Sequence, residues 1–199
     1  GDVYKRQVLI GNLGHLPLVR GLNFHLYGDY GLNVFNSRSL AYLKDKELES
    51  ACVSFELRFA QIRDLKKVLR AEAIVYGRLP LMITENCLVQ NETGCRLDRQ
   101  GPCVPEDGPC RCGQPNVLVD RTGAAFPLLP AYGHRTEIQN SKPLYLADRP
   151  EHRRLGLAYA RLRFTTETAE ECVSVVQNYL DAAPAAGDFT RGLYERVVE

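Results

Sequence analysis

Apolar and polar residues alternate in a strand–helix rhythm along the first part of the chain. Short apolar runs predict β-strands at Val8–Asn12, Asn23–Tyr27 with Leu32–Phe35, Ala51–Leu57 and Ala71–Tyr76. Two segments between them have the apolar spacing of helices: Arg38–Lys46, which follows the good N-cap residues Asn36 and Ser37, and Phe59–Leu69. Strands that alternate with helices of about ten residues indicate βαβ units and a parallel sheet.

This rhythm predicts an α/β fold in which residues 8–86 form part of a parallel sheet. Four strand–helix units fit an open sheet, and they fit equally the second half of an eight-stranded barrel, which takes about 250 residues in full. Half a barrel leaves two unpaired parallel edges, which suits a truncated gene better than a natural chain end. We therefore expect the C-terminal half of a (β/α)8 TIM-like barrel.

The first seven residues suggest an origin outside the natural protein. Asp2–Gln7 reads DVYKRQ, which is the in-frame translation of the end of a transposase-based sequencing adapter. We therefore set residues 1–7 aside as an adapter artefact and expect the natural chain to begin further upstream.

Two further regions follow the predicted half barrel. Residues 87–146 are rich in Gly, Pro, Asp and Cys up to Pro115 and then predict strands at Val117–Asp120 and Phe126–Leu129. Residues 147–199 predict a small α+β tail with a half-buried strand at Leu157–Phe164. A capping box then starts a helix whose apolar face is predicted to be buried. The capping box is Thr168 with Glu171, and the face consists of Cys172, Val175, Val176, Tyr179 and Leu180.

Composition excludes several classes of protein. Of the 199 residues, 45% are hydrophobic and 25% are charged, which is typical of a globular chain and not of a disordered or fibrous one. The net charge is +1, from 25 basic and 24 acidic side chains, so contact with a nucleic acid would need a local basic patch. No apolar run reaches the roughly 20 residues that cross a bilayer, and no signal peptide is visible. We expect a cytoplasmic protein that does not enter a membrane.

Five of the seven cysteines crowd into one stretch. Cys52 and Cys172 stand alone in apolar-periodic segments, whereas the others follow the spacing C-x7-C-x7-C-x6-C-x-C from Cys87 to Cys112. In a reducing compartment, clustered thiols indicate a metal or cluster site before they indicate disulfides. The stretch lacks the C-x2-C loop of most structural zinc sites, whereas iron–sulfur clusters accept more varied spacing. The spacing favours an iron–sulfur cluster over zinc, and uninvolved thiols are the third alternative.

Several segments resemble one known family. Glu72–Cys87 is similar to the signature segment of the peptidase U32 family, also called collagenase-like proteases, in which an acidic residue on the last barrel strand precedes a glycine and a downstream cysteine. Gly11–Gly14 and Asn33–Ser37 also resemble that family's barrel. Three later segments resemble its longer branch: Asp120–Pro127, Asn140–Arg149 and Phe189–Tyr194. The resemblance covers most of residues 8–199 and implies a barrel whose first half is missing here.

The resemblance also implies a cofactor and an activity. Several U32 members bind a 4Fe–4S cluster through four cysteines near the C-terminal end of the barrel. They act in oxygen-independent hydroxylation of a ribosomal RNA base, a transfer-RNA wobble uridine or ubiquinone precursors. Other members are described as peptidases that degrade collagen. The resemblance therefore makes RNA a candidate partner, with a protein substrate as the alternative.

The cysteines of this chain depart in part from the family pattern. Cys87 matches the family's cysteine that follows the Gly77 segment, but Pro80 stands where many members have another. His134 stands where the longer branch would have a cysteine. Either His134 is a nitrogen ligand or a cysteine of the inserted loop takes over. The candidate ligands are Cys87, Cys95, Cys110 and Cys112, with Cys103 and His134 as alternates.

Three residues are candidates for catalysis, and each also has a structural explanation. His15 ends the first predicted strand, where barrel active sites gather, although a capping or packing role suits it equally. Glu72 and Glu85 could be a paired acid and base, although salt-bridged or solvated carboxylates are commoner. Five basic residues could form a phosphate-contacting face or simply a solvated surface: Arg149, Arg153, Arg154, Arg161 and Arg163.

Three functions remain in view at this point. The first is iron–sulfur-dependent hydroxylation of an RNA base, which the resemblance and the cysteines favour together. The second is proteolysis of collagen-like chains, although the sequence has no Gly-x-Ser-x-Gly elbow and no His-Glu-x-x-His motif. The third is a non-catalytic interaction module that zinc holds together through the cysteines.

Overall fold

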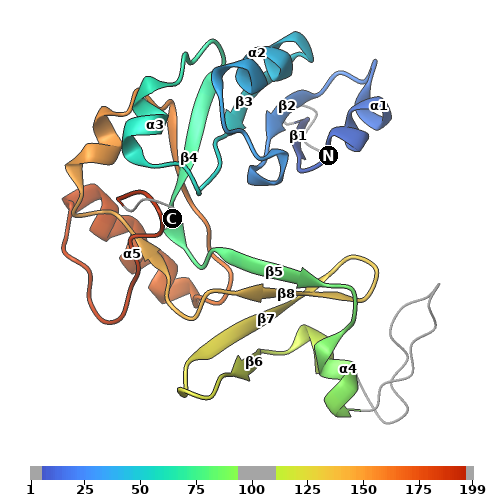
Figure 1. The fold of residues 1–199 in the computed structure, drawn as a ribbon, viewed down its shortest axis with the longest axis vertical. Helices are drawn as coiled ribbons and strands as arrows, with labels where there is room; N and C mark the ends of the chain where they lie inside the picture. Colours follow the sequence, from blue (N-terminus) through green and yellow to red (C-terminus); the bar gives the residue numbers. More distant parts are fainter. Residues whose placement is uncertain (1–5, 94–110, 196–199) are drawn as a thin grey trace. The chain divides into compact units, whose positions relative to one another are not determined.

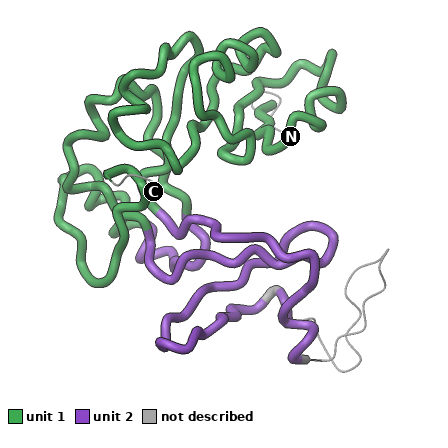
Figure 2. Tube along the Cα trace, viewed as in Figure 1, with its two compact units in different colours: residues 1–76, 144–163, 173–199 green, residues 77–143, 164–172 purple. Residues whose placement is uncertain are grey.

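A computed structural model describes residues 6–93 and 111–195 of the chain. Contacts between residues divide it into two compact units (Figure 2). The first consists of residues 1–76, 144–163 and 173–199, and the second of residues 77–143 and 164–172. Of the segment set aside as adapter-derived, residues 1–5 lie outside the described residues, and Gln7 is the first residue of a strand. In the described residues, no helix is long and apolar enough to span a membrane.

The first unit is built on a parallel sheet with the order β1-β2-β3-β4-β10, and a short strand, β9, also pairs with β4 (Figure 1). The strands are β1 Gln7–Ile10, β2 His25–Gly28, β3 Leu48–Cys52, β4 Arg70–Gly77, β9 Leu144–Tyr145 and β10 Tyr159–Leu162. The first four strands follow one another in space as they do in sequence. Because strand–helix–strand connections are right-handed, this order places the crossover helices α2 (Ser37–Asp45) and α3 (Phe59–Asp64) on one face. The α/β class and the parallel sheet are confirmed.

Helix α2 begins where the sequence predicts. The Asn36 side chain accepts hydrogen bonds from the backbone N–H groups of Arg38 (3.0 Å) and Ser39 (2.9 Å). Helix α3 is shorter than predicted, because it ends at Asp64 and not at Leu69. The Lys67 ammonium group donates to the carbonyl oxygen of Ile62 at 2.6 Å, and such a contact satisfies a carbonyl that the next helical turn would otherwise bind.

Shorter elements connect these strands and helices. A 3-10 helix, Leu13–His15, and helix α1, Leu16–Val19, lie between β1 and β2. A second 3-10 helix, Tyr30–Leu32, follows β2. A further 3-10 helix, Pro150–Arg154, precedes β10, and α5 (Ala169–Asp181) follows it. The core of this unit includes Ile10, Val34, Leu40, Ile62, Ile74 and Leu146, which are all fully buried.

The last part of the described chain joins this sheet instead of forming a separate tail. The strand predicted at Leu157–Phe164 appears as β10, which pairs in parallel with β4. Near the end of the chain, Tyr194 is buried, stacks on Phe59 with ring centroids 5.2 Å apart, and donates to the carbonyl oxygen of Ile74 at 2.6 Å. Residues 144–163 and 173–199 therefore belong to the unit of the parallel sheet.

One ion pair spans the middle strands of the parallel sheet. Asp29 follows β2 and Arg161 lies on β10, with β3 and β4 between these two strands. In a flat sheet, three strand spacings would separate β2 from β10 by about 14 Å. The two side chains nevertheless form an ion pair. The pair therefore bridges the width of β3 and β4, as expected if the sheet bends around these side chains.

The second unit contains an antiparallel sheet of order β5-β8-β7-β6. Its strands are β5 Pro80–Thr84, β6 Asn116–Val119, β7 Ala125–Ala131 and β8 Arg135–Gln139. The β6–β7 hairpin was predicted, and the Asp120 carboxylate stabilises its turn by accepting from the N–H groups of Thr122 (2.8 Å) and Ala124 (3.0 Å). Strands β5 and β8 were not predicted. Helix α4 (Leu88–Thr93) and the 3-10 helix Arg111–Gly113 complete the unit.

Helix α5 begins as predicted, but its apolar face is only partly buried. The Thr168 N–H group donates to Glu171 at 2.7 Å, and the Glu171 N–H group donates to the Thr168 hydroxyl at 3.3 Å, which confirms the capping box. Val175 is buried, whereas Leu180 is 70% exposed. Cys172 is half-buried and not a core residue, so that expectation was wrong.

Candidate functional site

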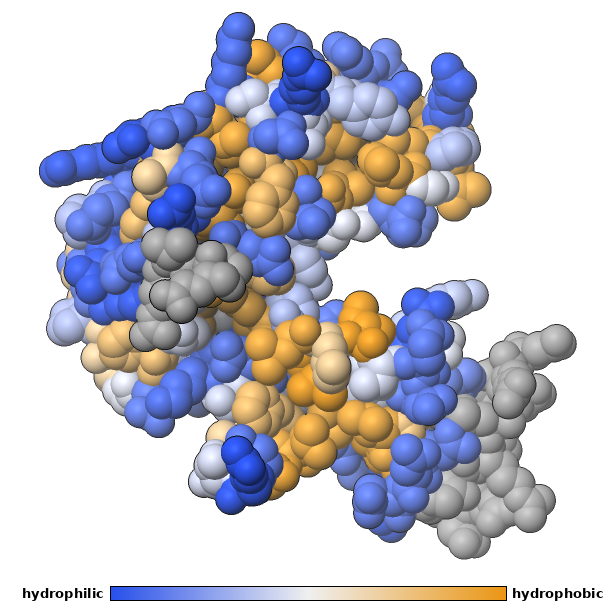
Figure 3. Space-filling view, viewed as in Figure 1, coloured by the Kyte–Doolittle hydropathy of each residue, from blue (hydrophilic) through white to orange (hydrophobic). Residues whose placement is uncertain are grey.

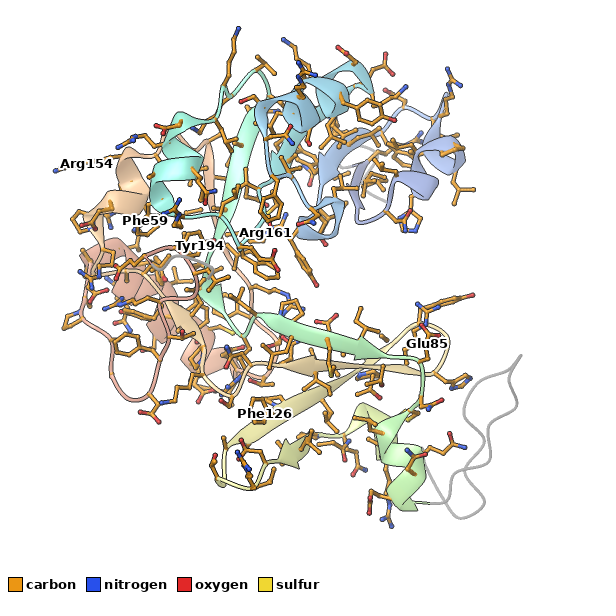
Figure 4. All side chains as sticks on the ribbon, viewed as in Figure 1. Phe59, Glu85, Phe126, Arg154, Arg161 and Tyr194 are labelled. Carbon is orange, nitrogen blue, oxygen red and sulfur yellow. The ribbon has the colours of Figure 1, made fainter. Side chains whose placement is uncertain are left out.

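Charged side chains gather on the uncovered face of the parallel sheet. Asp29, Glu72 and Arg161 come from three different parts of this sheet: the end of β2, strand β4 and strand β10. Arg161 is labelled in Figure 4. Its guanidinium group forms ion pairs with both carboxylates. Their side chains are only 15–22% exposed. One cation is thus held between two anions in a partly desolvated site.

This environment adjusts the proton affinity of Glu72. Burial raises the pKa of its carboxyl group, while Arg161 and a hydrogen bond with Cys52 act in the opposite direction. A carboxyl group whose pKa lies closer to neutrality can both accept and donate a proton under ordinary conditions. The structure therefore makes Glu72, a residue that the sequence already marked, a candidate acid or base.

Cys52 lies next to Glu72 but is unsuited to nucleophilic chemistry. Burial raises the pKa of its thiol to about 12. The side chain is fully buried, and the thiol hydrogen bonds to the Val53 carbonyl oxygen at 3.5 Å. Because the thiolate is the reactive form of cysteine, this thiol is inert at neutral pH.

Replacement of Glu72 by glutamine should change how stability depends on pH. Since the folded state raises the pKa of Glu72, the folded state binds more protons than the unfolded state between the unfolded value of about 4.3 and the raised value. This contribution to stability is complete below the unfolded pKa and is lost as pH rises through the folded pKa. The free energy of unfolding of the wild type minus that of Glu72→Gln, from urea titrations, should fall as pH rises from the unfolded pKa through the raised pKa of Glu72. A difference that increases with pH would contradict this assignment.

A second polar group lies nearer the amino ends of the same strands. Leu26 pairs with Leu48, but Tyr27 pairs with Ser50, so Glu49 is an extra residue that forms a bulge in β3. The Glu49 carboxylate contacts His25 and accepts from Arg70 at 2.7 Å, and these two partners lower its pKa. Arg70 in turn donates to the Tyr159 hydroxyl at 2.8 Å. This network connects four adjacent strands.

Sequence reasoning missed this network, although one signal was present. His25, Tyr27 and Asp29 alternate along β2 and its end, and such alternation places them on one face of a strand. The bulge at Glu49 shows no comparable signal, because it depends on the pairing register of two strands.

An aromatic group lies at the carboxyl ends of the strands. Tyr30 and Phe55, which follow β2 and β3, have ring centroids 5.9 Å apart. The Arg163 guanidinium group lies over the Tyr30 ring, 5.4 Å from its centroid. Flat rings next to a guanidinium group offer surfaces on which a planar heterocycle can stack.

The five basic residues named from the sequence do not share one setting. Arg161 and Arg163 lie in or directly after β10, beside the acidic and aromatic groups described above. Arg149 directly precedes the 3-10 helix Pro150–Arg154, and this helix contains Arg153 and Arg154. Arg149 forms an ion pair with Glu195 at 3.2 Å. The structure therefore favours ion pairing over a continuous basic patch.

Two of the predicted cysteine ligands share one hydrophobic cluster in the second unit. Cys87, which precedes α4, is 5% exposed and packs with Val89, Leu128 and Ile138. Cys112, in the 3-10 helix Arg111–Gly113, packs against the same cluster. Two of the cysteines thus pack against one hydrophobic cluster, and thiolates are soft ligands of the kind that suit iron or zinc. Cys95, Cys103 and Cys110 lie outside the described residues.

The other candidate residues lie apart from these sites or in different units. His134 is half-buried in the turn between β7 and β8, with a left-handed φ of 58°. Glu85 is exposed, lies in the second unit and is 3.4 Å from Arg135, whereas Glu72 belongs to the first unit, so their role as an acid–base pair stays a prediction. His15 is exposed at the end of a 3-10 helix. Within residues 6–93 and 111–195, no three His, Cys, Asp or Glu side chains form a metal-binding group.

These features define an α/β protein with a polar site on a parallel sheet and two cysteines that pack against one hydrophobic cluster. Residues 7–119 match the family model described as peptidase family U32, which covers more than half of the chain. The chain therefore belongs to the peptidase U32 family, and the resemblance noted in the sequence is confirmed. No curated protein and no solved structure matches it.

Proposed function

We propose that this chain is part of an iron–sulfur-dependent enzyme that hydroxylates a base of ribosomal or transfer RNA without oxygen. In this proposal the parallel sheet is the C-terminal half of a (β/α)8 barrel, and the protein acts in the cytoplasm. Membership of the U32 family supports an enzyme. The pairing of Asp29 with Arg161 across β3 and β4 supports a curved sheet such as that of a barrel.

The observation that carries the proposal is the meeting of Cys87 and Cys112 in one hydrophobic cluster. Cys87 is buried and not in a disulfide, and a low-polarity setting around thiolates is the kind of shell that tunes a metal centre. Cys87 and Cys112 would hold a 4Fe–4S cluster together with Cys95 and Cys110. Cys103 and His134 are the alternates for the fourth position.

The residues of the parallel sheet would serve the substrate. A bound cluster supplies the redox chemistry that side chains cannot perform. Glu72 would accept or donate a proton, and Arg161 would hold its carboxylate in place. Tyr30 and Phe55 would provide rings on which an RNA base stacks.

Metal analysis of anaerobically purified protein tests the cluster. We expect brown protein with about four irons and four sulfides per chain, and loss of the iron and its absorbance in Cys87→Ser and Cys112→Ser. Cys172→Ser is the matched control, because this thiol lies on α5 outside the cysteine-rich segment, and it should retain the iron.

Other outcomes would replace the proposal with one of its alternatives. Colourless protein with one zinc per chain would favour the zinc-held interaction module. Gelatin digestion that survives both iron chelation and Cys87→Ser would favour the peptidase that acts on collagen-like chains.

A further inference from the structure

Basic side chains are concentrated in two segments of the first unit. Residues 58–67, which contain α3 and the chain directly after it, carry four basic side chains and one acidic side chain. Residues 149–154, which contain the 3-10 helix Pro150–Arg154, carry three basic side chains and one acidic side chain. The two segments together have an excess of five positive charges, whereas the whole chain has a net charge of +1. They are therefore a local source of positive potential on a nearly neutral protein.

The two basic segments adjoin each other in the structure. Helix α3 contacts the 3-10 helix Pro150–Arg154. The Lys67 side chain, which caps the end of α3, passes beside Gly156, directly after the 3-10 helix: a Cβ atom at Gly156 would lie 3.8 Å from the Lys67 Cδ atom. We call the basic residues at this junction the outer basic patch: Arg63, Lys66, Lys67, Arg153 and Arg154.

The outer basic patch has cations available for a partner. The Arg63 side chain is 65% exposed, and Lys66, Arg153 and Arg154 are exposed as well. Within residues 6–93 and 111–195, Lys66 and Arg154 form no ion pair. Arg154 points away from the parallel sheet in Figure 4, and Figure 3 shows mostly hydrophilic surface on this side of the first unit.

The exposure of this patch follows from its layer in the fold. Helix α3 is a crossover helix between β3 and β4. Crossover helices form the outer ring of a barrel, so further strands in the sheet would leave the outward side of α3 in contact with solvent.

The composition of the outer basic patch suits phosphate groups. A guanidinium group binds phosphate oxygens through two parallel hydrogen bonds, and a lysine ammonium group binds them as a point charge. Among the described residues, none of the large exposed apolar side chains lies in residues 58–67 or 149–156. A protein interface would add an apolar centre, and a membrane-binding helix would add an apolar face. A polar surface with excess positive charge is instead typical of contact with a nucleic-acid backbone.

We infer that the outer basic patch binds the phosphate backbone of the RNA whose base is modified at the parallel sheet, an inference that rests on the proposed function. Helix α3 covers one face of the sheet, and Glu72 lies on the other. The patch therefore contacts a part of the RNA distant from the target base. Such contacts position the RNA and raise its affinity without reading its sequence.

The affinity for a fluorescently labelled transfer RNA tests this inference. Fluorescence anisotropy gives the binding constant of the chain at several salt concentrations. Lys66→Gln and Arg154→Gln each remove one exposed charge, so each should weaken binding about fivefold at about 0.1 M salt. Each should also lower the slope of log K against log salt by about one. Lys66→Arg keeps the charge and should bind as the wild type does.

Arg121→Gln is the matched control for these variants. Arg121 is an exposed arginine in the β6–β7 turn of the second unit, so its replacement should leave the affinity and the salt slope unchanged. Circular dichroism confirms that each variant is folded.

The iron content separates this inference from the proposed function. Cys87 belongs to the second unit, so Cys87→Ser should lose iron and still bind transfer RNA with the affinity of the wild type. Lys66→Gln and Arg154→Gln should keep the iron of the wild type. Protein without iron whose patch variants still bind RNA weakly would refute the cluster and support the patch.

Three results would overturn the inference. The first is a wild-type chain that binds no transfer RNA, or one whose affinity Lys66→Gln and Arg154→Gln leave unchanged. The second is an equal loss of affinity in Arg121→Gln, which would show that any surface cation counts alike. The third is binding to vesicles that contain phosphatidylserine but not to transfer RNA, which would assign the patch to a membrane surface.

Discussion

Arg161→Met should lower the free energy of unfolding by about 3 kcal/mol, because it leaves two partly buried carboxylates without their cation. Asp29 and Glu72 both pair with this guanidinium group, and their side chains are 22% and 15% exposed. Methionine fills a similar volume, so the loss would reflect charge more than packing. Urea unfolding followed by circular dichroism measures the change.

The exposed ion pair between Arg63 and Asp64 provides the control for Arg161. Arg63 donates to Asp64 at 2.8 Å, but both side chains are about two thirds exposed, so solvent screens the pair. Arg63→Met should therefore change the free energy of unfolding by less than about 0.5 kcal/mol. The triple variant with Arg161→Met, Asp29→Asn and Glu72→Gln should recover part of the loss. If Arg161→Met cost no more than Arg63→Met, the site would not be desolvated as described.

Tyr194→Ala should destabilise the first unit by about 3 to 5 kcal/mol. The Tyr194 side chain is buried, stacks on Phe59 at the start of α3, and donates to the Ile74 carbonyl oxygen on β4. The substitution would create a cavity between these elements and leave a buried acceptor unpaired. Thermal and urea unfolding would measure the loss.

Two further tyrosine variants divide this effect into its parts. Tyr194→Phe keeps the ring and removes only the hydroxyl, so it should cost about 1 kcal/mol. Tyr132→Ala alters a tyrosine that is 95% exposed in the β7–β8 turn and should cost less than about 0.5 kcal/mol. Equal losses for Tyr194→Ala and Tyr132→Ala would show that Tyr194 is not part of the core.

Local sequence patterns predicted the helices and strands better than they predicted which strands pair with one another. The N-cap at Asn36 and the capping box of Thr168 and Glu171 depend on residues close in sequence, and both appear as predicted. Strand β10 was also predicted, but its pairing with β4 was not, because Tyr159 lies 87 positions after its partner Glu72 and no local signal records such a pairing. Strand β5 was missed, since its three consecutive apolar residues, Leu81, Met82 and Ile83, lack the alternation of a half-buried strand.

In the candidate sites, too, single residues could be named from the sequence, but their partners from distant parts of the chain could not. Glu72 was named from its segment alone, whereas its partners Asp29 and Arg161 come from strands at distant positions in the sequence. The sequence suggested Glu72 and Glu85 as an acid–base pair; they belong to different units, and the pairing stays a prediction. The thiols of Cys87 and Cys112 were predicted to converge on one centre; the structure packs both residues against one hydrophobic cluster, and the shared centre stays a prediction.

The closeness of α4 and the 3-10 helix Arg111–Gly113 has a consequence for how this family can vary. Because these two described elements lie close together, a change in the number of residues between positions 93 and 111 would leave both of them in place. Doubling the length of a flexible loop costs only about 0.6 kcal/mol. Evolution could therefore add, remove or respace cysteines in this segment while the scaffold on either side stayed unchanged.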